Sequence, residues 1–425
     1  MLAIIKNFYF KHNEIINNFI WRSLQILGRQ GASFLVFIFV AKRLETYQFG
    51  VYIYLISLIF FLILFGDFGI STATSKYVVE YNIKNKEKLK SVLFNTLTIV
   101  FLISLIVSIL VILLGRFYLK DNYYYYVIYL LPLLFLVPAT SIYDGIYRGL
   151  KKFKKLSKIS LTTGIISLLF AYGLVLIYKF EGALVSQSMI YIILLIGLAI
   201  GYRDIKIKFD MKVMKEITKY SLVIGFATLG YYLFSRVVIL ILGHYQYLEV
   251  IAVYGLLTKI LGTLLIPFII VSNIIAPNFS GYFAKKRYSV VLNKYLKYVI
   301  LSFLSAIIFF IIIYFSVPVI IEIFFSGFYN EIFSNIFIPV IITYFVMSYS
   351  IIINTGIIVS TGYARIMTYS NIIIGILNLI LSLILLNITG YIGVIYSVLI
   401  LNLFAVIIYH YLYYLKIKKL AYILD

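Results

Sequence analysis

The sequence predicts an all-α polytopic membrane protein of about twelve transmembrane helices. Of its 425 residues, 63% are hydrophobic and only 12% are charged, and the mean hydropathy is +1.06. Water-soluble domains are about 45–50% apolar and about 25% charged, so this class is excluded. A helix that crosses the hydrocarbon needs about 20 mostly apolar residues. Such runs occur at 18–40, 49–71, 92–114, 123–143, 159–178, 183–201, 220–242, 251–275, 297–319, 335–358, 366–387 and 390–412.

The distribution of basic residues predicts that both termini lie in the cytoplasm. The chain is expected to be a multi-pass protein of the cell (plasma) membrane. The chain has 37 basic and 15 acidic residues, a formal net charge of +22. Cytoplasmic loops carry the excess of Lys and Arg. Of the 37, 28 lie before the first run, between even- and odd-numbered runs or after the twelfth, counting Lys297 at the edge of the ninth run, whereas five lie in the opposite loops. The charge is therefore interpreted as a topology signal that also contacts membrane lipids, not as a nucleic-acid site.

Two short internal repeats predict two six-helix lobes. Phe49–Tyr52 opens the second run and Ile251–Tyr254 opens the eighth, while Phe180–Ala183 and Tyr391–Val394 precede the sixth and the twelfth. Because six is even, both lobes run in the same sense, and such repeats commonly rock against each other around a central site. The predicted division is a cytoplasmic segment 1–17, an N-lobe 18–201, a cytoplasmic linker 202–219, a C-lobe 220–412 and a basic cytoplasmic tail 413–425.

The remaining four basic residues lie inside predicted spans. Each costs about 2.5–3.5 kcal/mol at a helix centre on insertion scales, so such a residue is a functional-site hypothesis by default. Asp67 and Asp144 are expected near the cytoplasmic ends of their spans, and Asp67 is interpreted as a helix-end or turn residue. An uncompensated cationic cavity favours an anionic substrate, and the arginine fork suits phosphate. The predicted substrate-binding residues are Arg22, Gln25, Arg29, Arg236 and Lys259.

Each of these cations has an alternative interpretation. Arg22 and Arg236 can extend to the cytoplasmic and outer headgroups, Lys259 can pair with a helix-end carbonyl, and Arg29 can have a structural role.

Polar residues recur at helical spacing on faces of four spans and indicate a wet interior. For those of the eleventh span, interhelical packing is the alternative. The candidate cavity-lining residues are Ser33, Thr228, Tyr232, Thr263, Asn273, Asn371 and Asn378.

Other residue types argue against an enzyme. Cysteine is absent, and only three scattered histidines are present, so neither a metal site nor a cofactor is predicted. The predicted loops do not exceed about 20 residues, which leaves little room for the catalytic domain of a glycan polymerase or ligase.

Several motifs resemble one family. Ala41–Leu44, Phe49–Tyr52 and Gly66–Ile70 are similar to the first two helices of the Wzx-type oligosaccharide-lipid flippases, in the multidrug/oligosaccharidyl-lipid/polysaccharide (MOP) exporter superfamily. Gly145–Gly149 and Thr361–Arg365 resemble that family's cytoplasmic turns after helices 4 and 10. The resemblance covers essentially the whole chain. It implies two six-helix lobes in a V around a central cationic cavity.

The resemblance also implies a function. Such a protein carries a polyprenyl-(pyro)phosphate-linked oligosaccharide from the cytoplasmic to the outer leaflet, and Arg29 and Arg236 match headgroup contacts. Many relatives have an acidic residue where this chain has Val238, which puts ion coupling at that position in doubt.

The predicted function is therefore a flippase for surface polysaccharide or glycan assembly that works by alternating access. It is expected to be a monomer, with glycan-assembly proteins as possible partners. The first alternative is a cation-coupled multidrug (MATE-like) antiporter of the same superfamily, which the lack of mid-membrane carboxylates disfavours. A membrane-embedded glycan polymerase or ligase and a non-transporting scaffold are the others.

Overall fold

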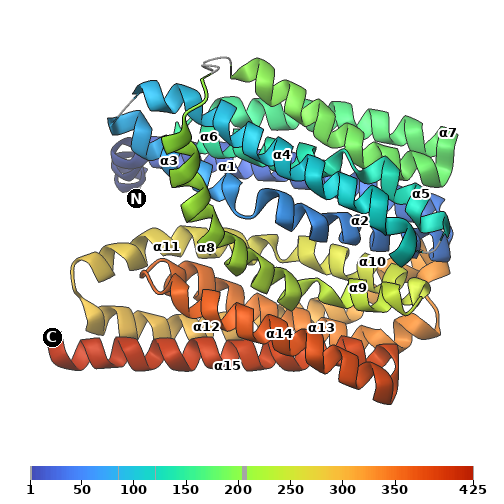
Figure 1. The fold of residues 1–425 in the computed structure, drawn as a ribbon. Coiled ribbons are helices and arrows are strands. Elements are labelled where there is room, and N and C mark those ends of the chain that lie inside the picture. Colours follow the sequence, from blue (N-terminus) through green and yellow to red (C-terminus); the bar gives the residue numbers. More distant parts are fainter. Residues whose placement is uncertain (1, 85, 120, 203–207, 425) are drawn as a thin grey trace. The chain divides into compact units, whose positions relative to one another are not determined.

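The computed structural model describes residues 2–84, 86–119, 121–202 and 208–424, which are almost entirely helical (Figure 1). They divide into two compact units: the first unit is Met1–Leu44 with Leu55–Thr228, and the second unit is Glu45–Tyr54 with Leu229–Asp425. The first unit contains α1 (Leu2–Arg43), most of α2 (Thr46–Asp67), α3 (Ile70–Lys84), α4 (Lys86–Tyr118), α5 (Asp121–Leu130), α6 (Leu133–Gly149), α7 (Phe153–Gly201) and the start of α8 (Met211–Ser235).

The second unit contains the rest of α8 and the beginning of α2. Its other helices are α9 (Val237–His244), α10 (Leu248–Leu264), α11 (Ile266–Ala284), α12 (Tyr288–Phe324), η1 (Ser326–Phe328), α13 (Glu331–Ile353), the π-helical turn η2 (Asn354–Val359), α14 (Ala364–Thr389) and α15 (Tyr391–Leu424).

The number of membrane-spanning helices agrees with the twelve spans predicted from the sequence. Within the described residues, ten helical stretches are long and apolar enough to cross a membrane, and the bent pair of α8 and α9 makes an eleventh. α7 is 49 residues long, about 74 Å if straight, more than twice the hydrocarbon thickness. It is two helices joined at Lys179, where φ is 45°. A Cβ on Gly182 would lie 2.0 Å from the carbonyl oxygen of Leu174, so this turn requires glycine. Counting α7 twice brings the number to twelve.

Two predicted spans end or break earlier than expected. The second span was expected to run to residue 71, but α2 ends at Asp67 and the chain turns through Phe68 and Gly69, both with positive φ. The Asp67 carboxylate accepts hydrogen bonds from the backbone N–H and the hydroxyl of Ser71, at 2.9 and 2.8 Å. Its interpretation as a helix-end residue is confirmed.

The eighth span, predicted as continuous, breaks at Leu265, between α10 and α11. Pro267 lies in the first turn of α11. Proline is tolerated in the first turn of a helix but interrupts the hydrogen bonds of a longer one.

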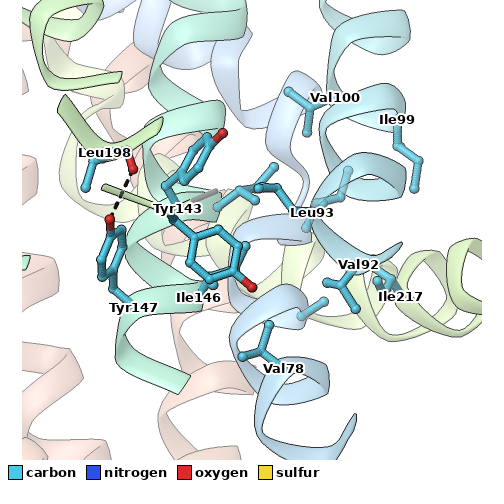
Figure 2. Packing of buried hydrophobic residues seen from close by; sticks show 14 of the residues in the cluster. Val78, Val92, Leu93, Ile99, Val100, Tyr143, Ile146, Tyr147, Leu198 and Ile217 are labelled. Atoms are coloured by element: carbon cyan, nitrogen blue, oxygen red, sulfur yellow. Dashed lines mark hydrogen bonds between the residues drawn. The ribbon is translucent and has the colours of Figure 1, made fainter. Parts of the chain in front are cut away.

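The first unit has a hydrophobic core to which the predicted linker contributes (Figure 2). Val213 and Ile217, at the start of α8, are fully buried among residues of α3, α4 and α6. The Tyr147 hydroxyl donates a hydrogen bond of 3.1 Å to the Leu198 carbonyl across this core (Figure 2). Residues 203–207 of the linker lie outside the described residues.

A tyrosine on α3 also holds the start of α8. The Tyr81 hydroxyl donates a hydrogen bond to the Glu216 carboxylate. Burial, followed by the negative charge of Glu216, raises the pKa of Tyr81 above its ordinary value, so the phenol remains a protonated donor at neutral pH. The start of α8 is therefore part of the first unit, whereas the predicted lobe boundaries at 201/202 and 219/220 stay predictions.

Gly50 allows the beginning of α2 to pack in the second unit. A Cβ at this position would lie only 1.9 Å from the carbonyl oxygen of Leu248, which opens α10. We expect Gly50→Ala to destabilise the protein by about 1–3 kcal/mol, because backbone atoms must move apart. Unfolding in detergent micelles measures this. The matched control is Gly31→Ala. Apart from the adjacent backbone of its own helix, no described atom lies within 4 Å of a Cβ added there, and alanine is expected to stabilise the helix by up to about 1 kcal/mol. Equal stability of Gly50→Ala and wild type would contradict the packing argument.

Candidate functional site

The predicted site residues form one group in each unit, and the group of the first unit contains a carboxylate. Asp144 on α6 lies 3.6 Å from the guanidinium of Arg22 on α1, and its other oxygen lies 2.7 Å from Nε of Arg148. The Gln25 amide donates to Asp144 at 3.2 Å and accepts a hydrogen bond from Arg22. The expectation that these cations lack a counter-ion is therefore wrong for Arg22.

Arg29 and Ser33 lie further along α1, in the lining of a cavity of about 30 Å³ within the first unit. The opposite wall comes from α7 and includes the hydroxyls of Ser160, Thr163 and Ser167. A cavity of this size holds about one water molecule. Among the described residues, Arg29 has no carboxylate partner.

Small residues place α1 against α7 at this depth. A Cβ on Gly164 would lie 3.1 Å from the carbonyl oxygen of Gly28, and one on Gly28 would lie 2.6 Å from the side chain of Leu161. Close packing through small residues is typical of membrane helices, which have no hydrophobic driving force between them. It positions the Arg29 backbone beside the polar wall of α7.

In the second unit, Arg236 lies at the break between α8 and α9, where the chain bends by 58°. Its side chain is exposed, and the described part of the chain provides no carboxylate partner for it. Its positive charge acts on that of Lys259 on α10, so the two cations repel each other. The sequence predicted one continuous span over 220–242. The break instead places Arg236 immediately before the N-terminus of α9, which favours anions.

Asn378 on α14 stabilises this break. Its amide N–H groups donate to the carbonyls of Leu233 and Phe234, at 3.2 and 3.0 Å, just before the bend. Carbonyls at a helix end lack helical partners and must be satisfied inside a membrane. Its oxygen accepts hydrogen bonds from Ser382 and Ser397. Because the side chain is fully buried and all these bonds are internal, Asn378 does not line a cavity; it packs between helices.

The other candidate cavity-lining residues differ in their surroundings. Asn371 accepts a hydrogen bond of 2.5 Å from Tyr409, which joins α14 to α15. Thr263 bonds to the Lys259 carbonyl on α10, whereas Asn273 is exposed on α11, beyond the interruption at Leu265. The remaining two lie on α8, where Thr228 is exposed and Tyr232 is buried.

We expect Asn378→Leu to destabilise the protein by about 1–3 kcal/mol, because two carbonyls at the α8–α9 break lose their donors. Unfolding by heat or by sodium dodecyl sulfate measures the effect. Asn402→Leu is the matched control. Among the described residues, that amide bonds only to the Val398 carbonyl within its own helix, at 2.8 Å, and the change is expected to stay within about 0.5 kcal/mol. Similar losses in both variants would show that Asn378 has no special role at the break.

Two features of the site are not among those predicted from the sequence. Arg148 belongs to a motif that predicts only a turn, although its spacing of four residues from Asp144 on one helix is typical of an ion pair. The break at Arg236 has no proline to mark it. Among the described residues, no group of three or more His, Asp or Glu side chains could hold a metal ion.

Comparison with known proteins identifies the family. A family model described as polysaccharide biosynthesis protein matches residues 15–283. No curated protein gives a significant match.

Several solved structures share the fold of the whole chain. A multidrug resistance MATE family transporter of the MOP superfamily, in an inward-facing conformation, is 14% identical with a TM-score of 0.76, over 96% of this chain and 100% of that one. The lipid II flippase MurJ is 16% identical with a TM-score of 0.74, over 95% and 90%. A MOP superfamily transporter from Pyrococcus furiosus is 14% identical with a TM-score of 0.61, over 96% of each chain. The chain belongs to the polysaccharide biosynthesis protein family and is a multi-pass membrane protein with the fold of MOP-superfamily transporters.

Proposed function

We propose that the chain is a flippase that carries a polyprenyl-(pyro)phosphate-linked oligosaccharide from the cytoplasmic to the outer leaflet of the cell membrane. Both termini are cytoplasmic in this proposal. The observation that carries it is a pair of arginines in membrane-spanning helices, Arg29 and Arg236, for which the described residues provide no carboxylate. Maintaining such charges in a membrane is expensive, and a phosphate ligand compensates them. The family and the fold support a transporter of glycan precursors.

The mechanism follows from where these groups lie along their helices. The phosphate binds at the cytoplasmic end of α1 and contacts Arg22 and Arg29, while the prenyl chain remains in lipid. Alternating access of the two lobes then presents the phosphate to Lys259 and Arg236, in the outer part of their spans. The α8–α9 break contributes the N-terminal end of α9, and the helix dipole favours an anion there. The chain's own cations thus replace water around the headgroup.

Flipping by purified protein tests the proposal. Proteoliposomes containing a fluorescent polyprenyl-pyrophosphate oligosaccharide are treated with a membrane-impermeant quencher, and the quenched fraction is followed over time. Active protein is expected to move label between leaflets much faster than protein-free vesicles do. A phosphatidylcholine with the same fluorophore is the control and is expected to remain in place. Equal rates for both lipids would indicate a non-specific scramblase and contradict the proposal.

The multidrug antiporter remains the alternative to exclude. In such a carrier, a mid-membrane carboxylate is expected to couple drug and cation. Here the Asp67 carboxylate caps α3, and the Asp144 carboxylate pairs with arginines. Efflux of cationic dyes driven by a Na⁺ or proton gradient, with no flipping of the lipid-linked glycan, would favour the antiporter. Lengthening of the glycan by the purified protein would instead reveal a polymerase.

A further inference from the structure

Two arginines from different helices share one carboxylate at the cytoplasmic end of the first unit. Arg22 on α1 faces Oδ1 of Asp144, and Arg148 on α6 faces Oδ2. The carboxylate is 10% exposed, whereas the side chains of Arg22 and Arg148 are 31% and 38% exposed. The buried anion therefore lies beneath two partly accessible cations. The group has a net charge of +1.

Both arginines have further donors available. A guanidinium carries five N–H donors. In the described part of the chain, Arg22 uses Nη1 for Gln25 and Asp144, and Arg148 uses Nε for the Asp144 side chain and carbonyl. Their other terminal nitrogens form no hydrogen bond or ion pair among the described residues. A phosphate oxygen accepts such donors well, and two guanidinium groups side by side can hold one phosphate together.

The surroundings attract anions. The first turns of α7 and the loop before it expose Lys151, Lys152, Lys154, Lys155 and Lys158. This cluster raises the local concentration of a negatively charged headgroup. The same segment is joined to α1: the Ser157 hydroxyl donates to the Trp21 carbonyl at 2.6 Å, and the Lys154 ammonium lies 5.6 Å from the Trp21 ring centre.

We propose that Asp144 is a resident counter-ion that a substrate phosphate displaces. The arriving phosphate binds Arg22 and Arg148 together, and each guanidinium exchanges a carboxylate contact for a phosphate contact. Arg148 thereby becomes part of the cytoplasmic loading site. The proposal rests on the proposed function in one respect: the phosphate belongs to the lipid-linked substrate.

The exchange has a mechanistic advantage. Without Asp144, two neighbouring cations would repel each other in the empty protein and would bind the phosphate tightly once it arrived. With Asp144 present, the carboxylate pairs with both arginines again when the phosphate leaves. The affinity for the phosphate is therefore limited by an anion that belongs to the protein, so the substrate can be both bound and released. Neutralising it is expected to tighten binding and to slow turnover.

The chain's single tryptophan provides the measurement. Trp21 is adjacent in sequence to Arg22 and lies beside Lys154, so its fluorescence responds to binding at this site. The full-length protein in detergent is titrated with farnesyl phosphate, with farnesol, and with inorganic phosphate as competitor. Farnesyl phosphate is expected to bind, and farnesol is not. Competition by inorganic phosphate at a comparable concentration would identify free phosphate as the ligand, whereas a need for far higher concentrations would identify the lipid phosphate.

The variants distinguish exchange from a structural role. Arg148→Gln is expected to weaken farnesyl phosphate binding about tenfold, and Asp144→Asn to tighten it about fivefold. Arg365→Gln is the matched control: this exposed arginine lies in the corresponding turn of the second unit, and affinity should stay within about twofold. If Asp144→Asn does not fold, Gln25→Glu replaces it. That variant adds a competing carboxylate beside Arg22 and is expected to weaken binding about tenfold.

Transport kinetics separate this inference from the proposed function. In the flipping assay, Asp144→Asn is expected to lower both the apparent KM and kcat, whereas a merely structural role would raise KM or leave it unchanged. Weaker binding in Asp144→Asn, or unchanged binding in Arg148→Gln, would overturn the exchange. Equal binding of farnesol would overturn the phosphate site. Flipping that persists in Arg148→Gln with unaltered KM would also reject the loading site while leaving the flippase proposal intact.

Discussion

Replacing Arg29 and Arg236 together by alanine is expected to abolish delivery of the lipid-linked oligosaccharide to the outer leaflet. Each arginine can offer a charge-assisted contact to the phosphate, and such contacts contribute about 1.5–3 kcal/mol each. Losing both corresponds to roughly 100-fold or more in rate, because 1.4 kcal/mol is a factor of ten. The proteoliposome assay with labelled glycolipid measures the loss. The single variants are expected to retain intermediate rates.

The controls must separate transport from folding. Removing a cation from a membrane-spanning helix makes the span more apolar, so insertion of the double variant should be unaffected or improved. Helical content and thermal unfolding in detergent check this. Arg29→Lys with Arg236→Lys keeps both charges but loses the planar fork, and partial activity is expected. Wild-type flipping by the double alanine variant would refute the role of both arginines and remove the main support for the flippase.

The sequence predicts the spans well because each depends on local composition. A run of about 20 apolar residues is long enough to cross the membrane whatever its neighbours are. The sequence therefore predicts two spans, 159–178 and 183–201, and the positive φ at Lys179 divides the long helix α7 between them. The helix end at Asp67 is also local, since the Asp67 carboxylate accepts hydrogen bonds from Ser71, four residues away. Such features can be predicted from neighbouring residues alone.

The parts that the sequence could not predict depend on distant partners. Gln25 and Asp144 are 119 residues apart, and Asn378 lies 145 residues from the Leu233 carbonyl to which it donates. In the predicted span 220–242 the hydrophobic pattern continues through Arg236, so no neighbouring residue marks the break that Asn378 stabilises. The ion pair of Arg22 was missed for the same reason. The sequence predicts Asp144 near the end of its span, but no pattern indicates which helix lies opposite.

The membrane potential is expected to drive transport in the outward direction if the moving species is an anion. A potential of 100 mV, negative inside, changes the free energy of one outward-moving negative charge by about 2.3 kcal/mol. This shifts the equilibrium between the leaflets about 50-fold per charge, since 1.4 kcal/mol is tenfold. Proteoliposomes with a potassium gradient and valinomycin impose the potential, and quenching of labelled glycolipid reports its distribution.

The size of this effect depends on what moves with the phosphate. Arg29 and Arg236 belong to helices that remain in the membrane, so their charges do not travel across it with the substrate and the headgroup charge is the one displaced. A pyrophosphate-linked substrate should therefore respond more steeply than a monophosphate-linked one, and an uncharged prenyl alcohol should not respond. Collapsing the gradient with a potassium ionophore under symmetric potassium is the control. Identical distributions at 0 and −100 mV would mean that another ion compensates the charge, and that the potential alone does not set the direction.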